Sequence, residues 1–233
     1  MQVPAPRVQR YDIYSKIHKA LRACMCNTLT LVGRLDGDDP ADVSRVLGQV
    51  RALVAMCRSH LAKEDEFVHP AMEERHPGSS GRIEGEHMRH DQACLELLSA
   101  ADGVASATPR GRRQRIAHLY RHLALFVAEN FLHMDYEETV HNTVLWDTHG
   151  DGELEALEGA IVASLAPEMK NASLRWMVAG LNPQERALLM EGMREAMPMQ
   201  AFDAVLAQVR QQLSPADWGK LGVALGLDEL LCA

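Results

Sequence analysis

Signals for β-structure are scarce in this chain of 233 residues. Aromatic residues make up 5% of it, and no Asn-Gly or Asp-Gly pair joins two alternating segments. Basic residues are also in the minority, with 24 Lys and Arg against 32 Asp and Glu, so the formal net charge is −8. Because binding to nucleic-acid phosphates needs a concentrated basic face, this balance argues against a nucleic-acid partner.

Long apolar runs are absent too. The longest apolar uncharged stretch, 23–33, is about half of a membrane span, and residues 1–10 lack the apolar core of a secretory signal. The five cysteines are an odd number without a metal-type CxxC spacing, which indicates reduced thiols. We therefore expect a cytoplasmic protein with no membrane partner.

What the sequence does contain is helical periodicity. Apolar residues recur with a period near 3.6 over about 12–35, 40–76, 82–103 and 109–149, and Pro40 and Pro109 each follow a capping residue. Four long amphipathic helices joined by short loops predict an all-α protein whose main domain, over 10–148, is an up-and-down four-helix bundle.

A second helical region is predicted over 152–230. Asn182 and Ser214 each precede a proline and early acidic residues, which is typical of helix starts. We expect three or four shorter helices here, forming a C-terminal appendage of unassigned role in which the methionines of 190–199 fill gaps in a small core.

Histidine is distributed unevenly, because all 11 histidines lie between His18 and His149. Two His-Glu pairs with a spacing of four, His60/Glu64 and His133/Glu137, lie within apolar stripes, and this spacing puts both side chains on one helix face. Burying these groups without a partner costs several kcal/mol, which a bound cation removes.

The other histidines divide by helix phase. His69 lies nine residues after His60, about 180° around a regular α-helix, so we expect it to be solvated. We expect His141 to be solvated as well and His122 to be structural. His18 lies on the apolar stripe of the first helix. On the third helix His87 and His90 compete for one role, with His90 as a substitute or an added fifth histidine.

The candidates form an internal repeat, since each half of the predicted bundle supplies one helix with a lone histidine and one with a His-Glu pair. Four imidazoles and two carboxylates suit two transition-metal ions bridged by the two glutamates. The predicted ligands are His18, His60, Glu64, His87, His90, His133 and Glu137.

The ordered motifs resemble the hemerythrin-like, His-His-Glu cation-binding family. The resemblance covers about 10–148 and is carried by the residues from Ile17 to Leu21, from His60 to Glu64, from Glu86 to His87 and from His133 to Glu138. It implies a non-haem di-iron centre, in a family whose members carry, store or sense dioxygen or respond to iron and redox state. Oxygen carriers of the family have an Asp on the last helix, whereas Glu137 occupies that place here, which favours roles other than reversible transport.

We therefore expect a protein that binds two iron ions, with manganese or zinc as alternatives, and that binds or senses dioxygen, a related diatomic or peroxide, or handles iron. No nucleophile motif or phosphate-binding loop indicates an enzyme. Two alternatives stay open: a di-iron oxidase or peroxide-decomposing enzyme, and a metal-stabilised sensor or scaffold that acts through its C-terminal helices. A homo-oligomer is also left open.

Overall fold

The structure is a computed structural model that describes residues 10–227, and within this range the chain is helical and contains no strand. The prediction of an all-α protein is confirmed. In chain order the elements are α1 (Ser15–Gly33), α2 (Pro40–Lys63), η1 (Glu64–Val68), α3 (His69–Arg75), α4 (Gly81–Ala105), α5 (Pro109–Tyr136), η2 (Glu137–His141), α6 (Asn142–Thr148), α7 (Asp151–Ser164), α8 (Pro167–Gly180), α9 (Pro183–Ala196), α10 (Met199–Gln212) and α11 (Pro215–Leu225).

Capping residues begin three of these helices where the sequence predicts. The Asp39 carboxylate accepts a hydrogen bond from the Ala41 amide, directly before Pro40 at the start of α2. Asn182 begins α9 and Ser214 begins α11 in the same way. Each cap satisfies an amide that the helix itself leaves without a partner, so these starts are set locally.

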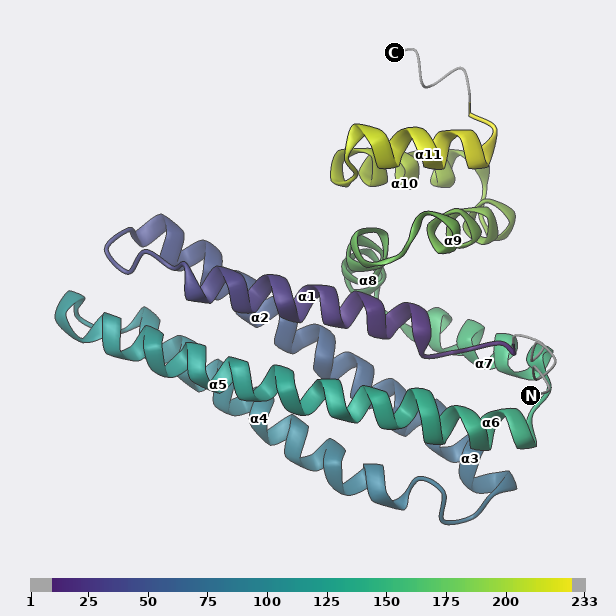
Figure 1. Cartoon of the computed structure of the whole chain (residues 1–233), viewed down its shortest axis with the longest axis horizontal. Helices are drawn as coiled ribbons and strands as arrows, with labels where there is room; N and C mark the ends of the chain where they lie inside the picture. Colours follow the sequence, from purple (N-terminus) through teal and green to yellow (C-terminus); the bar gives the residue numbers. More distant parts are fainter. Residues whose placement is uncertain (1–9, 228–233) are drawn as a thin grey trace, which may run out of the picture. The chain divides into compact units, whose positions relative to one another are not determined.

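The centre of the bundle is formed by long helices. In Figure 1, α2, α4 and α5 run lengthwise beside one another, and α4 packs against both of the others. From Met25 onward α1 also contacts this group, because Thr28 is hydrogen-bonded to Gln49 of α2 at 3.1 Å. Fully buried leucines on the facing stripes form the core: Leu53, Leu97, Leu119 and Leu123.

Two of the long helices contain a π-helical turn, which the sequence analysis did not predict. In η1 the amide of His69 donates to the carbonyl of Glu64, and in η2 the amide of Asn142 donates to the carbonyl of Glu137. These i→i+5 bonds insert one extra residue into a helix that otherwise continues on both sides. The insertion changes the helical phase of every residue that follows.

The chain divides into two compact units, and the division differs from the predicted domain bounds of 10–148 and 152–230. Within the described range, one unit contains 10–15 and 25–166, and the other contains 16–24 and 167–227. Helix α7 belongs to the first unit because Leu154 is buried with Tyr14, Met72 and Leu145. The end of the predicted second region, 228–230, lies outside the described residues.

The second unit has its own apolar core from α8 to α11, in which Val178, Met190, Phe202 and Leu221 are buried. With α7, five helices lie in the described part of the region 152–230, where three or four were predicted. The buried Arg186 donates to the carbonyl oxygens that end α8. Of the methionines predicted to fill this core, Met190 does so, whereas Met199 is 70% exposed.

Two further features concern membrane-spanning potential and the cysteines. No helix among residues 10–227 has both the length and the apolar character needed to cross a membrane. The cysteines in the described part, Cys24, Cys26, Cys57 and Cys94, are free thiols, and all but Cys26 are buried. Cys232 lies outside the described residues.

Candidate metal centre

Ionisable side chains gather inside the first unit where the two π-helical turns begin. Glu64 is the first residue of η1 and Glu137 is the first residue of η2, and both carboxylates are buried. His87 from α4 and His133 from the last turn of α5 are buried beside them. Such groups are rarely buried unless they are paired or bound to a cation.

One group of four possible ligands lies wholly within this unit: Glu64, His87, His133 and Glu137, each with one ligand atom within 4.8 Å of the others. The His133 Nε2 atom lies 3.2 Å from a Glu137 oxygen. The His87 Nε2 atom lies 3.7 Å from a Glu64 oxygen and 3.8 Å from a Glu137 oxygen. An ion with bonds of about 2.1 Å holds its ligand atoms about 3 to 4 Å apart, so the spacing suits a single cation.

A second group uses the same two carboxylates. His60, Glu64 and Glu137 also bring ligand atoms within 4.8 Å of one another, and the His60 Nε2 atom lies 3.3 Å from a Glu64 oxygen. The two glutamates are therefore common to both groups. This is the arrangement that bridging carboxylates between two ions require.

His18 lies in the part of α1 that groups with the other compact unit. Its side chain is fully buried, and it precedes Met25 by seven residues, or about two turns, so both lie on one face of α1. Its role as a ligand stays a prediction.

Two carboxylates fix the orientation of the histidines. The His87 Nδ1 atom lies 2.7 Å from an Asp65 oxygen, and the His133 Nδ1 atom lies 3.1 Å from a Glu86 oxygen. An ionised carboxylate only accepts hydrogen bonds, so each imidazole donates from Nδ1 and keeps Nε2 as a ligand atom. Sequence reasoning missed Asp65 and Glu86, although each is adjacent to a predicted ligand. Histidines that bind metals are typically held in this way.

The electrostatics of the site favour a cation. Burial raises the pKa of Glu64 well above its usual value, and the nearby charge of Glu137 raises it further. The buried Nε2 atom of His87 has no hydrogen-bond partner among the described residues. A bound metal cation would stabilise both carboxylates in their charged form and accept the imidazole lone pair. The residues present therefore fit a metal ion.

The structure corrects the prediction that His69 and His141 are solvated, because their exposed fractions are 7% and 0%. The π-helical turn explains the error. One inserted residue between His60 and His69 shifts the phase by about 100° and returns His69 to the buried side. Its Nδ1 atom lies 3.1 Å from Asp65. His141 lies beside Tyr14, with 3.3 Å between its Nδ1 atom and the hydroxyl oxygen.

His90, the other candidate on α4, is buried against His133, with the ring centroids 4.5 Å apart. It belongs to neither of the groups described above, whereas His87 belongs to one. Burial, first of all, and the neighbouring His133 and His87 together lower the pKa of His90 to about 4. His90 is therefore neutral near pH 7.

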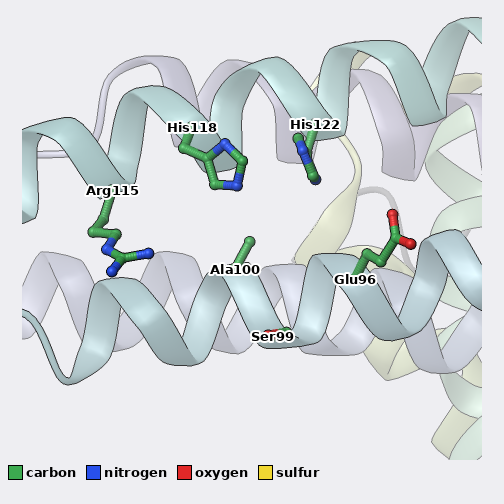
Figure 2. Close-up of a pocket in the computed structure, with 6 residues that line it drawn as sticks. All are labelled: Glu96, Ser99, Ala100, Arg115, His118 and His122. Atoms are coloured by element: carbon green, nitrogen blue, oxygen red, sulfur yellow. The ribbon is translucent and has the colours of Figure 1, made fainter.

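Another pair of histidines lies elsewhere on the bundle. Figure 2 shows His118 and His122 of α5 turned toward α4, where they line a shallow pocket of about 200 Å³ with Arg115 and Glu96. These side chains form no ligand group among the described residues.

The matched family agrees with this geometry. The family model described as the hemerythrin HHE cation binding domain matches residues 10–145. The chain belongs to the hemerythrin HHE cation-binding family. Comparison with curated proteins and with solved structures gave no significant match. Membership implies cation binding, and the two groups that share Glu64 and Glu137 are where this hemerythrin-like chain can hold a metal.

Proposed function

We propose that the protein holds two non-haem iron ions and uses them to bind or sense dioxygen, or to handle iron. The observation that carries the proposal is the presence of Glu64 and Glu137 in both ligand groups. In this proposal His87 and His133 hold one ion, His60 holds the other, and the glutamates bridge them. When bound, a di-iron centre supplies an electron reservoir and open positions for a small ligand.

The surroundings of the site limit the size of that ligand. His87 and His133 are 4% and 3% exposed, and Glu137 is fully buried. This burial favours dioxygen, a related diatomic or peroxide over a larger substrate. Imidazole and carboxylate ligands also accept manganese or zinc, which therefore remain alternatives to iron.

Metal content tests the proposal. Purified protein should bind close to two iron ions per chain. Glu64→Gln should weaken both ions because it removes a shared charged ligand, whereas His87→Ala should weaken one. Glu66→Gln is the matched control, since Glu66 is exposed and pairs with Lys63. One firmly bound ion that is indifferent to Glu64→Gln would contradict the bridging arrangement.

Reaction with air separates a carrier from a sensor. With four protein ligands at one or both ions, open positions remain, and we expect air to oxidise the reduced protein lastingly. Absorption bands that form with oxygen and disappear on deoxygenation would instead indicate reversible transport. Repeated turnover of added peroxide would favour the peroxide-decomposing alternative.

A further inference from the structure

The outer face of α5 presents a stripe of exposed residues with the spacing of a coiled coil. Its members follow one another at intervals of four, three, four and three residues: Arg121, Leu125, Ala128, Leu132 and Asp135. These intervals keep all five within about 80° of arc on one face of the helix. All five are exposed, with Leu125 at 64% and Leu132 at 73%. We call this stripe the outer seam.

The charges of the outer seam are arranged symmetrically about its centre. Arg121 and Asp135 each lie seven residues from Ala128, on opposite sides of it. Neither charged side chain forms an ion pair among residues 10–227. When two copies of α5 lie antiparallel and cross at Ala128, Arg121 of each copy faces Asp135 of the other. The outer seam is therefore complementary to itself in this orientation, whereas a parallel pair would bring like charges together.

The same antiparallel register also pairs the apolar residues. Leu125 of one copy then lies beside Leu132 of the other, and the two Ala128 residues meet at the centre, where small side chains let the helices approach closely. Next to the outer seam, a groove of about 500 Å³ is lined by Glu129 of α5 and by Met88 of α4, which is 71% exposed. Met88 therefore adds apolar surface beside the seam. Contiguous exposed apolar surface of this kind marks interaction sites.

We propose that two copies of this chain pair through the outer seam, with their α5 helices antiparallel. A membrane or an unrelated protein would not require two opposite charges at equal distances from a central alanine, so the symmetry favours a second copy. Fourteen residues separate the ends of the seam, which therefore spans about 21 Å. An interface of this length lies at the small end of specific interfaces, and we expect a dimer that dissociates in the micromolar range.

Charge reversal tests the orientation. Sedimentation velocity of the full chain over a range of concentrations gives the dissociation constant of the dimer. Arg121→Asp alone creates two pairs of like charges in an antiparallel dimer, and Asp135→Arg alone does the same. We expect each variant to weaken self-association at least tenfold. The double variant, with both charges exchanged, pairs opposite charges again and should regain wild-type affinity.

Mixing identifies the partner as a second copy. In an equal mixture of Arg121→Asp and Asp135→Arg chains, both pairs of an antiparallel heterodimer join opposite charges. The mixture should therefore form a dimer with about wild-type affinity, although each variant alone stays monomeric at the same concentration. Arg113→Asp is the control, because Arg113 is exposed on α5, lies about 80° around the helix from Arg121 and pairs with Asp38. It should self-associate like the wild type.

The apolar part of the outer seam is tested separately. Leu125→Ser combined with Leu132→Ser should give a monomer, whereas Leu188→Ser, at a leucine 67% exposed in the second unit, should not. The inference is overturned if the wild type is monomeric throughout the micromolar range, if the single charge variants associate like the wild type, or if their mixture does not associate. None of the seam residues is a candidate ligand, so metal content should stay unchanged and tests the proposed function separately.

Discussion

Replacing Asp65 by alanine should weaken metal binding although Asp65 is not a ligand in either glutamate-bridged group. Its carboxylate accepts hydrogen bonds from His87 at 2.7 Å and from His69 at 3.1 Å. Without this acceptor both rings can rotate or take the other tautomer, which places a proton on Nε2. In the proposed two-ion centre, the ion at His87 should then be bound less tightly, while the ion at His60 should be unaffected.

The size of the effect follows from the two hydrogen bonds. A hydrogen bond to a charged group contributes about 1.5 to 3 kcal/mol, but the Asp65 side chain is 51% exposed and solvent screens part of it. Loss of an orienting partner typically costs about 10- to 100-fold in metal affinity, or about 1.4 to 2.7 kcal/mol. We expect Asp65→Ala to lower the metal affinity by an amount in this range. Asp65→Asn keeps an acceptor oxygen without the charge and should fall between Asp65→Ala and the wild type.

Competition with a chromophoric chelator measures the affinity of each ion. Glu66→Ala is the matched control, because Glu66 follows Asp65 in the same π-helical turn, is 54% exposed on its side chain and pairs with Lys63. It removes the same charge without touching an imidazole partner. Equal affinities for Asp65→Ala and Glu66→Ala would refute the reasoning, since general electrostatics would then account for the change.

Two other predictions concern stability. A Cβ atom at Gly180 would lie 2.8 Å from the carbonyl oxygen of Lys19, so Gly180→Ala should destabilise the second unit by about 1 to 3 kcal/mol. Gly192 has open space around it, so Gly192→Ala should stabilise the same unit by about 0.5 to 1 kcal/mol. Thermal unfolding of both variants compares them, and equal shifts of the melting temperature would contradict the packing argument. The pKa of Glu73 is lowered to about 2, first by the backbone amide of Gly78. Because the folded state favours the charged form, Glu73→Gln should lower the melting temperature at pH 7, and its difference from the wild type should shrink as the pH falls from about 4.5 toward 2; a constant difference would count against this interaction.

Sequence reasoning recovered the features that are encoded locally. The helical class follows from periodicity, and the starts of α2, α9 and α11 follow from their capping residues. The phases of His60 with Glu64 and of His133 with Glu137 are also local, since four residues span about one turn. Each of these features depends only on residues within one helix, so the sequence of that helix is enough to predict it.

Features that depend on neighbouring elements were missed. The π-helical turns add one residue to a helix whose apolar pattern continues, so a constant period assigned His69 to the wrong side. Asp65 and Glu86 orient histidines that lie on other helices. Helix α7 begins with acidic residues after Gly150, which is typical of a new helix and led us to place it in the second region. Its Leu154 is nevertheless buried in the first unit.

The number of residues in each π-helical turn sets how the candidate metal ligands before it are oriented relative to the apolar residues after it. Met72 and Leu145 lie beyond η1 and η2 and are buried in the cluster that includes Leu154. Deleting one residue within either turn would rotate the following helix by about 100° and carry its buried residue out of that cluster. A deletion in either turn should therefore disturb the candidate ligands and the apolar cluster more than a substitution there does. In related proteins, the corresponding turns should differ in amino-acid type more often than in length.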